Sequence, residues 1–496
     1  MAPLTAPDRD FFRLVSRAAF VNPFSREREE LDRAIAGWVG EGPPEAVLAR
    51  AVRTVGERVA ALEEKGPLRP GAFGAEDGPL VEAAVLFDAF HRHVADLDGL
   101  IRDQLAGGET PCAVPFARDA LGLLTRRGIA APEARRTFAF FYQLRRAFYF
   151  IDRSLVGRCA SMGELRRHLW NDVFTADTGW YGRRLWDRME DFSTLLLGET
   201  GTGKGSAAAA IGRSGFIPFD ERMGCFSESF ARNFIALNLS QFPESLIESE
   251  LFGHRKGAFT GAVDHHQGVF ARCTPHGAIF LDEVGDVSVP VQIKLLQVLQ
   301  ERTFSPVGSH ERLRFRGRVI AATNRPLDGL RRDGRFRDDL YYRLCSDVVV
   351  VPPLRRRLAE DPRELGLLVA HLAARALGGE EPEIAAAVEE ALARDLLPAY
   401  PWPGNVRELE QAVRRVLLTG SYRGEAGAAT DDLRARLLEG IDGGTLDARE
   451  LLQGYCALLH GRWGTYEEVA RRTGLDRRTV KKHVLAAAGG RGEDGE

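Results

Sequence analysis

The chain has 496 residues, of which 44% are hydrophobic and 28% charged, and its formal net charge is −3 at pH 7. This length predicts about three domains of a globular protein, and the charge excludes a polycation, so any nucleic-acid surface must be local. The six cysteines include no C-x-x-C pair, and neither a signal peptide nor an apolar stretch of about 18 residues is evident. We therefore expect a cytoplasmic protein without disulfides, zinc or a membrane span.

Residues 1–157 are predicted to form a mostly helical regulatory or sensory domain. Apolar residues recur there at steps of three and four, as on one face of a helix: Phe141, Leu144, Phe148 and Ile151. His91 and His93 resemble a metal-binding pair, but a two-residue step places them on different faces of a helix. We interpret them as solvated or core histidines, and the signal that this domain senses is not evident.

From about residue 190 the pattern changes to short apolar runs separated by helical stretches. The runs are 195–197, 234–237, 279–281, 319–322 and 348–351. Such runs are typical of parallel strands that are covered by helices on both faces. The sequence therefore predicts a multidomain protein with an α/β core over 158–360 and a helical lid over 361–422.

The first of these runs leads into a phosphate-binding loop. The pattern Gly-x-x-x-x-Gly-Lys ends at Lys204 and precedes an alanine-rich helix, which is the context that the motif requires. Backbone N–H groups of such a loop surround phosphates, and the lysine reaches the terminal ones. A chance glycine-rich turn is the alternative, but strand, spacing and helix agree on the loop. The predicted nucleotide-binding residues are Gly198, Glu199, Thr200, Gly201, Thr202, Gly203, Lys204, Gly205 and Ser206.

One position in this loop departs from the usual pattern. Gly205 stands where a serine or threonine ordinarily supplies a hydroxyl to magnesium. Ser206 lies one place later and substitutes only if the turn shifts.

Two acidic residues end the third apolar run. Asp282 is expected to hold Mg²⁺, and Glu283 is expected to polarise the water that attacks ATP. A solvated turn is the alternative interpretation, but the position downstream of a phosphate loop favours the catalytic one.

A glycine-framed hexapeptide lies between the phosphate loop and the acidic pair: Gly257, Ala258, Phe259, Thr260, Gly261 and Ala262. Glycines at both ends predict a mobile loop tip that presses Phe259 and Thr260 against a partner. The alternative is a buried aromatic side chain on an ordinary hairpin.

With these motifs, residues 194–420 resemble the sigma-54-dependent transcription activators, which are AAA+ ATPases. The resemblance rests on the segments 250–254 with the hexapeptide, 281–286, 321–325, 336–344 and 402–409. It implies ATP and Mg²⁺ as cofactors, sigma-54 RNA polymerase as partner of the hexapeptide loop, and a homo-oligomeric ring, expected to be a hexamer.

The resemblance also implies roles for single residues. Asn324 would be the sensor of the terminal phosphate, and Arg407 would lie near the phosphates. Asn238 would restrain Glu283 until sigma-54 is engaged. Arg337 and Arg343 would act as arginine fingers in the site of an adjacent subunit, although internal ion pairs are an alternative for both.

Three features differ from the family pattern. Gly205 replaces the usual glutamate of the family, about ten extra residues lie between Lys204 and Asn238, and the run 164–190, which is rich in Trp and Arg, is longer than usual. We expect altered adenine contacts or magnesium geometry, with hydrolysis retained.

The C-terminal part is predicted to contain a linker over 423–445 and a basic helix-turn-helix over 446–488. A helix ends before Gly474, and Asp476 is placed to cap the next helix. This pattern resembles a reader of the DNA major groove, and a surface charge cluster on a small bundle is the alternative. The candidate DNA contacts are Arg477, Arg478, Thr479, Lys481 and Lys482.

Together these features predict a transcriptional activator that binds upstream DNA, forms a ring and uses ATP hydrolysis to remodel closed complexes of sigma-54 polymerase. Two alternatives stay open. One is a DNA-binding regulator whose ATPase controls only its own assembly, and the other is an AAA+ remodeller of a different client.

Overall fold

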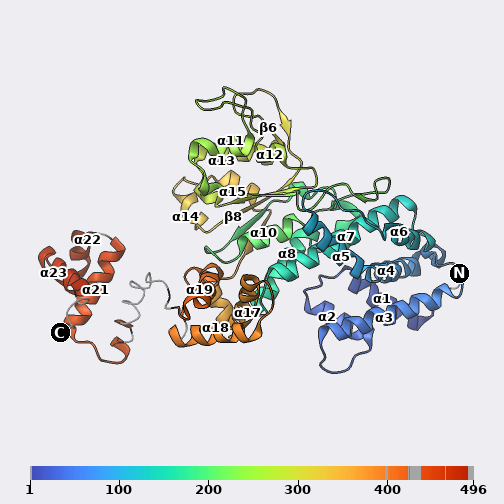
Figure 1. Cartoon of the computed structure of the whole chain (residues 1–496), viewed down its shortest axis with the longest axis horizontal. Coiled ribbons are helices and arrows are strands. Elements are labelled where there is room, and N and C mark those ends of the chain that lie inside the picture. Colours follow the sequence, from blue (N-terminus) through green and yellow to red (C-terminus); the bar gives the residue numbers. More distant parts are fainter. Residues whose placement is uncertain are drawn as a thin grey trace. The chain divides into compact units, whose positions relative to one another are not determined.

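The computed structural model describes residues 3–396, 400–422, 424, 437–438, 440–463 and 465–489 (Figure 1). These residues fall into two compact units. The first consists of the described residues up to 391 and from 397 to 420, and the second consists of 392–396 and the described residues from 421 onward. Among the described residues, no helix has both the length and the apolar character needed to cross a membrane.

The N-terminal region is helical, as predicted. Its helices are α1 (Ala6–Phe20), α2 (Arg26–Ala36), α3 (Pro44–Glu63), η1 (Pro70–Phe73), α4 (Gly74–Arg92), α5 (Val94–Gly107), α6 (Ala117–Arg126) and α7 (Ala131–Ser154). The predicted apolar face belongs to α7, where Phe141 and Ile151 are buried. His91 packs against Phe87, and burial lowers the pKa of His91 to about 4. The described residues contain no cluster of metal-binding side chains.

The five predicted strands are present and form one parallel sheet in the order β4-β5-β8-β1-β9. They are β1 (Thr194–Leu197), β4 (Phe234–Asn238), β5 (Ala278–Asp282), β8 (Arg318–Thr323) and β9 (Asp347–Val350). All of β8 is buried, as expected for a strand with helices on both faces. The register places Asn238 opposite Asp282, at the carboxyl edge of the sheet.

Helices and short strand pairs surround this sheet. The helices are α8 (Ala160–Phe174), α9 (Thr178–Trp180), α10 (Lys204–Gly212), α11 (Glu244–Phe252), α12 (Val269–Arg272), α13 (Val289–Glu301), α14 (Leu327–Arg332) and α15 (Asp338–Leu344). The strand pairs are β2 (Phe219–Asp220) with β3 (Cys225–Phe226), and β6 (Thr303–Phe304) with β7 (Leu313–Arg314). Single short turns are η2 (Tyr181–Leu185), η3 (Met189–Asp191), η4 (Leu239–Gln241) and η5 (Val284–Asp286).

Helix α7 does not pack as part of a separate N-terminal body, although the sequence predicts a domain that ends near residue 157. One hydrophobic cluster runs from Phe138 of α7 through Leu169 of α8 to Ala207 of α10 and Ile320 of β8. The reason is the extra sequence after α10, whose Phe219 lies edge-on to Phe138 at 5.1 Å between ring centroids. Helices α5–α7 and the sheet therefore share one core, whereas α1–α3 pack with most of α4 around a separate hydrophobic cluster.

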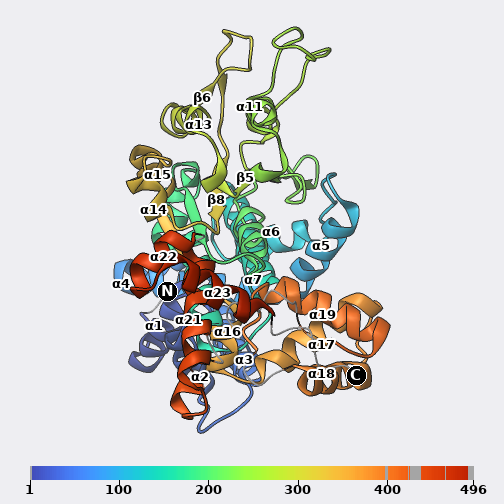
Figure 2. The same ribbon diagram turned by 90° about the vertical axis from the view of Figure 1, so that its left-hand side faces the viewer.

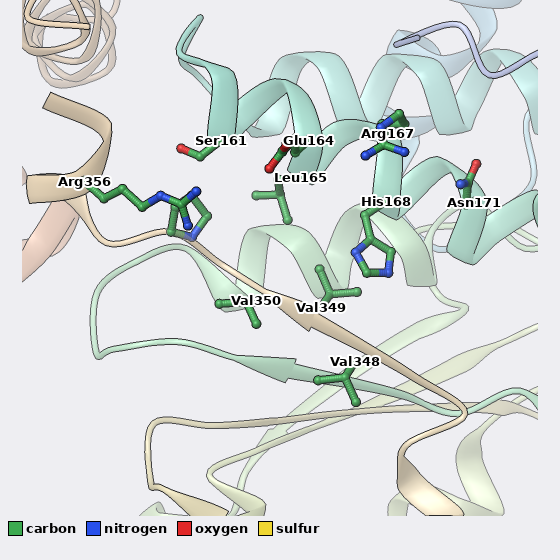
Figure 3. Close-up of a pocket in the computed structure, with 11 residues that line it drawn as sticks. Ser161, Glu164, Leu165, Arg167, His168, Asn171, Val348, Val349, Val350 and Arg356 are labelled. Carbon is green, nitrogen blue, oxygen red and sulfur yellow. The ribbon is translucent and has the colours of Figure 1, made fainter. Parts of the chain in front are cut away.

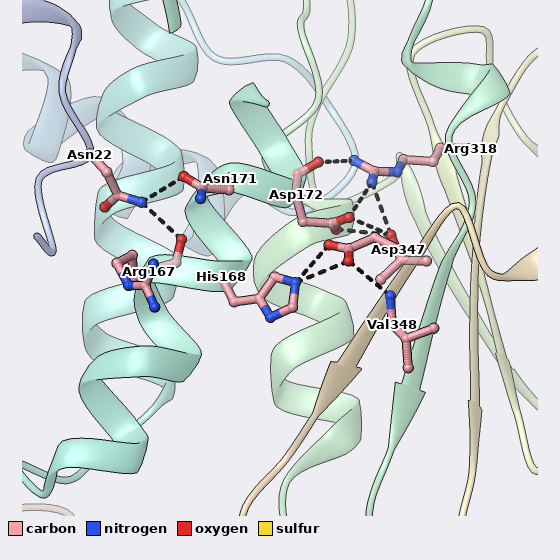
Figure 4. Close-up of polar contacts among 9 residues, drawn as sticks. Asn22, Arg167, His168, Asn171, Asp172, Arg318, Asp347 and Val348 are labelled. Atoms are coloured by element: carbon pink, nitrogen blue, oxygen red, sulfur yellow. Dashed lines mark hydrogen bonds and ion pairs between the residues drawn. The ribbon is translucent and has the colours of Figure 1, made fainter. Parts of the chain in front are cut away.

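Helix α8 is fixed to the sheet by a polar network (Figure 4). Asp172 accepts hydrogen bonds from Arg318 Nη2 at 2.9 Å and from the Thr194 hydroxyl at 2.7 Å. His168 Nε2 lies 2.9 Å from a carboxylate oxygen of Asp347, and Asn22 reaches α8 from the loop between α1 and α2. These bonds tie the segment before the first strand to the amino ends of β1, β8 and β9.

The lid follows the sheet and consists of α16 (Leu354–Glu360), α17 (Glu364–Leu377), α18 (Pro382–Asp395) and α19 (Asn405–Thr419). The predicted linker over 423–445 lies largely outside the described residues. The C-terminal unit contains α21 (Ala448–Trp463), α22 (Tyr466–Thr473) and α23 (Arg477–Gly489), which pack around the fully buried Cys456, Val469 and Val480.

Candidate nucleotide site, protruding loop and C-terminal helices

The phosphate loop connects β1 to α10 at the carboxyl edge of the sheet. Gly201 and Gly203 have φ angles of +78° and +102°, which other residues rarely adopt. Lys204 is buried, and its Nζ donates to the carbonyl oxygens of Gly198 at 2.9 Å and Glu199 at 3.1 Å. Burial lowers the pKa of Lys204, while the negative charges of Glu283 and Asp282 oppose this shift. The amine is thus held inside the loop and faces the acidic pair.

The acidic pair lies where it was predicted, but Asn238 does not contact the expected carboxylate. Its Nδ2 donates to Asp282 Oδ2 at 3.4 Å, because the register of β4 and β5 sets these two residues side by side. The Glu283 carboxylate instead accepts the backbone N–H of Asn324 at 3.2 Å. Glu283 has a φ of 57°, a left-handed conformation that is uncommon outside glycine and turns the chain away from Asn238.

Asn324, the predicted sensor residue, contacts both halves of the site. Its Nδ2 donates to the Thr200 hydroxyl at 2.7 Å, while its backbone N–H contacts Glu283. Asn324 therefore connects the phosphate loop to the carboxylate that is predicted to polarise water.

The carboxylate of Asp282 faces two cationic side chains. Burial raises its pKa, and the charges of Lys204 and Arg407 oppose the rise. Arg407 lies on the first turn of α19, and its charge acts on Asp282. The cationic loop and this acidic side chain are groups that suit a nucleotide phosphate and a magnesium ion.

Contacts between the lid and the phosphate loop include three residues to which the sequence analysis gave no role. Asn405 Nδ2 donates to the Thr200 carbonyl oxygen at 3.0 Å, and the N–H of Val406 donates to the Gly201 carbonyl oxygen at 3.0 Å. Arg355 makes a bidentate contact with Glu199, with distances of 2.7 and 2.5 Å, and this contact lowers the pKa of Glu199. No spacing rule identifies these partners, because they lie about 150–200 residues away from the loop in sequence.

The remaining loop residues have different environments. Thr202 is buried, and its hydroxyl donates to the Glu199 carbonyl oxygen at 2.8 Å. Gly205 and Ser206 lie exposed on the first turn of α10. A Cβ atom at Gly205 would have as its nearest neighbour a carbon of Phe280 at 3.9 Å. The site therefore has room for a hydroxyl-bearing side chain at position 205, although the residue there is glycine.

Both predicted arginine fingers have partners within the single chain. Arg337 precedes α15 as its N-cap, and its guanidinium contacts the Asp339 carboxylate at 2.7 Å. Arg343 lies in the last turn of α15, and its Nη2 donates to the Leu299 carbonyl oxygen at 2.7 Å. The internal ion pair that the sequence left open as an alternative is thus present for Arg337 in the isolated chain, whereas Arg343 contacts backbone.

The hexapeptide forms a closed turn at the end of a long loop that extends from the sheet (Figure 2). The N–H of Gly257 donates to the Ala262 carbonyl oxygen at 2.8 Å, and Gly257 and Gly261 have φ angles of +79° and +103°. Thr260 is exposed, but Phe259 is half-buried with its ring 4.9 Å from that of His254. The side chain that the turn presents is therefore Thr260, and Phe259 is partly covered.

A second loop supports the base of the first. The N–H of Arg255 donates to the Val307 carbonyl oxygen at 3.0 Å, and the Arg255 guanidinium pairs with Glu311. Val307 and Glu311 belong to the loop between β6 and β7, which extends in the same direction in Figures 1 and 2. Arg255 therefore holds the two loops together.

The C-terminal unit has the turn and the cap that the sequence predicts. Gly474 ends α22 with a φ of 70°, and Asp476 accepts the backbone N–H groups of Arg478 at 2.9 Å and Thr479 at 3.0 Å. Among the candidate DNA contacts, Arg477 pairs with Glu467 at 2.8 Å, and the Thr479 hydroxyl is bonded to Asp476. The remaining candidates, Arg478, Lys481 and Lys482, are exposed.

A cavity of about 500 Å³ lies between α8 and β9, the last strand of the sheet (Figure 3). Cationic side chains predominate among its polar lining residues, which include Arg167, His168 and Arg356 with one acid, Glu164. Arg356 and His168 are engaged by Glu360 and Asp347, respectively. The cavity is close in sequence to the phosphate-loop partner Arg355 but contains none of the predicted catalytic residues.

Comparison with known proteins places this geometry in a family. Residues 186–350 match the family described as Sigma-54 interaction domain, and residues 360–445 match the AAA+ ATPase lid domain. The lid match thus includes the segment that was predicted as a linker.

The curated relatives are transcriptional regulators. The chain is 39% identical over 265 residues to the Nif-specific regulatory protein of Azotobacter vinelandii, a match that covers 52% of this chain and 46% of the relative. It is 40% identical over 298 residues to the transcriptional regulatory protein ZraR of Klebsiella oxytoca, with coverages of 58% and 62%. It is also 40% identical over 229 residues to the regulatory protein AtoC of Escherichia coli, with 46% of each chain covered. The chain thus spans about half the length of these relatives.

Among solved structures, NtrX from Brucella abortus in complex with ADP is 21% identical to this chain. The match covers 75% of this chain and 80% of the NtrX chain. Its TM-score of 0.41 is too low to support a functional inference. The family matches apply to the central part of the chain: residues 186–350 belong to the Sigma-54 interaction domain family and residues 360–445 to the AAA+ ATPase lid domain family.

Proposed function

We propose that this protein hydrolyses ATP to remodel sigma-54 RNA polymerase at promoters, from DNA sites that its C-terminal helices bind. The observation that carries the proposal is the meeting of Lys204, Asp282, Glu283 and Asn324 at one edge of the sheet, in a unit that also extends an exposed Thr260 on a glycine-framed turn. One part suits phosphate chemistry, and the other suits contact with a protein partner.

The phosphate loop would bind the nucleotide by exchanging internal contacts for contacts with phosphate. Lys204 Nζ gives up the carbonyl oxygens of Gly198 and Glu199, and its charge then stabilises the terminal phosphates. Asp282 would hold Mg²⁺, which neutralises charge on the phosphates when bound. Glu283 would orient the attacking water, and Asn324, which contacts both Glu283 and Thr200, would report the state of the terminal phosphate.

Ring assembly would complete the site. A phosphoryl transition state gains about 10³–10⁵ in rate from an arginine finger. Arg337 and its partner Asp339 are both substantially exposed, with side chains 39% and 42% accessible, so water screens their ion pair and the pair contributes little to stability. Release of this arginine to a neighbouring subunit therefore costs little. We infer that Arg337 is the more available finger, because Arg343 is held by a backbone carbonyl oxygen.

DNA binding would use the exposed cations at the start of α23. Arg478, Lys481 and Lys482 are free of the acidic partners that engage Arg477 and Thr479. Cationic contacts to phosphate make affinity fall steeply with salt concentration. Substitution of Lys481 or Lys482 should therefore weaken operator binding and reduce its salt dependence.

The decisive experiment is open-complex formation on a sigma-54 promoter with purified full-length protein, sigma-54 polymerase and ATP. Promoter melting is expected with the wild type, and no melting with Lys204→Ala. Lys65→Ala, an exposed lysine of the N-terminal region, is the matched control and should melt the promoter normally. Melting that is independent of Lys204 would overturn the proposal.

The alternatives are separated by Thr260→Ala. If the exposed threonine contacts sigma-54, this variant loses activation and keeps most of its ATP hydrolysis. Val263→Ala, which changes another exposed side chain of the same loop, serves as the control. A regulator whose ATPase controls only its own assembly would activate normally with Thr260→Ala, and a remodeller of another client would not bind DNA specifically through residues 446–488.

A further inference from the structure

A second cavity, of about 330 Å³, lies at the amino end of the sheet. Ala278 and Arg318, which line it, begin β5 and β8. The opposite ends of these strands carry Asp282 and Thr323, at the nucleotide edge. The cavity is therefore separated from the nucleotide site by the length of the strands, and its lining includes no residue of the phosphate loop or the acidic pair.

The walls of this cavity come from the two segments that lengthen the chain relative to its family. Trp186 and Met189 belong to the long run before the first strand, and Gly215 and Phe216 belong to the extra sequence after α10. The rings of Trp186 and Phe216 pack together with centroids 4.6 Å apart. Val173 and Ile211 add aliphatic surface. The result is an apolar, largely aromatic wall of a size that suits a small ligand.

One buried polar group in this wall is incompletely satisfied. Gln143 of α7 is 1% exposed, and its Nε2 donates to the Tyr181 hydroxyl at 2.6 Å and to the Ser214 carbonyl oxygen at 2.9 Å. The Ser214 carbonyl oxygen only accepts hydrogen bonds, so the amide orientation is fixed and Gln143 Oε1 cannot take the place of Nε2. Gln143 Oε1 is buried and has no hydrogen-bond partner. An unpaired buried acceptor is unfavourable, and a ligand N–H or O–H group would satisfy it.

Cations without partners also line the cavity. Arg314 and Arg316 are exposed, and in the described structure neither side chain forms a hydrogen bond or an ion pair. Arg318 is different, because Asp172 neutralises it. Asp187 and Glu190 line the cavity as well but do not pair with Arg314 or Arg316. Two free guanidinium groups near an apolar wall favour a ligand with a carboxylate, which arginine binds in a bidentate manner.

We propose that this cavity is a binding site for a small aromatic carboxylic acid with a ring hydroxyl or amino group. The ring would lie against Trp186 and Phe216, the hydroxyl or amino group would donate to Gln143 Oε1, and the carboxylate would reach Arg314 and Arg316. The site also includes Ile211 and Gly212, the last residues of the helix that begins at Lys204. A ligand there would contact both the N-terminal helix α7 and the phosphate-loop helix. The proposal is independent of the client on which the ATPase acts.

The test is direct binding of the three hydroxybenzoate isomers and the three aminobenzoate isomers to the full-length protein, by isothermal titration calorimetry. Benzoate lacks the donor group, and phenol lacks the carboxylate, so both are matched probes. We expect saturable binding of at least one hydroxy- or aminobenzoate, at least tenfold tighter than benzoate and phenol. The ring contact should also change the fluorescence of Trp186, a change that Trp186→Phe removes.

Variants assign each contact. Arg314→Ala and Arg316→Ala should each weaken binding of the acid several-fold and the double variant at least tenfold, while Arg312→Ala, an exposed neighbour outside the cavity, should not change it. Gln143→Met should bring the affinity of the hydroxy- or aminobenzoate down to that of benzoate. Since Gln143 is buried, the exposed arginines keep the test valid if that variant does not fold. The proposal is overturned if none of the six acids binds, or if binding is equal in the wild type and the double arginine variant.

Discussion

The two ends of the parallel sheet differ in how their polar side chains are held. At the carboxyl edge, the predicted catalytic side chains make short polar contacts that a ligand can replace, such as those of Lys204 with the carbonyl oxygens of its own loop. At the amino edge, Arg146 is fully buried between the aromatic rings of Tyr142 and Phe230 and donates to the carbonyl oxygens of Arg213 at 2.7 Å and Gly215 at 2.6 Å. One edge can be rearranged by a nucleotide, and the other is locked to the N-terminal helices.

This difference suggests how a signal from the N-terminal region could reach the ATPase. Helix α10 connects both edges, because it begins at Lys204 and ends at Gly212, next to the carbonyl oxygens that Arg146 holds. The extra sequence after α10 therefore packs helix α7 against the α/β core. The variants below separate the two edges, in order of decreasing expected effect.

Loss of the charge at the carboxyl edge should have the largest effect. Lys204→Ala removes the cation that faces the phosphates, and we expect ATP hydrolysis to fall by about 10²–10³-fold because an oriented charge in a buried site is not replaced by water. The free energy of unfolding should change little, since the two carbonyl oxygens that lose the amine can be hydrated. Steady-state phosphate release measures the first quantity and urea denaturation the second. Equal losses of activity and stability would show that the edges are not distinct.

Loss of the buried arginine should give the reverse result. Burial lowers the pKa of Arg146 to about 10, yet the side chain remains charged at neutral pH and satisfies two carbonyl oxygens. Arg146→Met should lower the free energy of unfolding by about 2–4 kcal/mol, because two charged hydrogen bonds are lost and their acceptors stay buried. Arg153→Met, an exposed arginine over Tyr149 on the same helix, is the control and should cost less than about 1 kcal/mol. Urea denaturation followed by tryptophan fluorescence distinguishes the two variants.

A hydroxyl can be introduced at the carboxyl edge by substitution of Gly205. Gly205→Thr should lower the Mg²⁺ concentration for half-maximal ATP hydrolysis by about three- to tenfold, because the first turn of α10 has room for the side chain. Gly205→Ala gives the same turn a better helix former without the hydroxyl and should leave the magnesium dependence unchanged. An equal response of both variants would mean that the hydroxyl has no part in metal binding.

The smallest effect is expected from the pair that fixes α8 to β9. A hydrogen bond that His168 donates to the Asp347 carboxylate raises the pKa of His168 above its usual value of 6.5. Because the folded-state pKa is the higher one, the pair stabilises the protein fully below about pH 6.5, and this contribution is lost as the pH rises through the folded-state pKa. His168→Gln should therefore cost stability at pH 6 and little at pH 8.5. The His168 side chain is 41% exposed, so the difference should be below about 1 kcal/mol. Thermal unfolding of both proteins across this pH range measures it, and a difference that grows with pH would contradict the assignment.

The sequence by itself determined the strands, the phosphate loop, the acidic pair and the capped turn before α23. Each depends on local rules: a buried parallel strand needs a continuous apolar run, a phosphate loop needs glycines at fixed spacing, and Asp476 caps the helix that follows it in sequence. Chemistry also restricts these residues, since few side chains substitute for Lys204 or Asp282.

Only the tertiary structure decided the contacts between distant segments. The pairing of Asn238 with Asp282 in place of Glu283 follows from strand register and the left-handed backbone of Glu283. Three further contacts depend on which surfaces meet in space. His254 partly covers Phe259, Arg355 binds the Glu199 carboxylate, and α7 packs in one hydrophobic cluster with the sheet. Local sequence patterns do not specify such meetings, because packing is decided by the complementary shapes and charges of surfaces that are far apart along the chain.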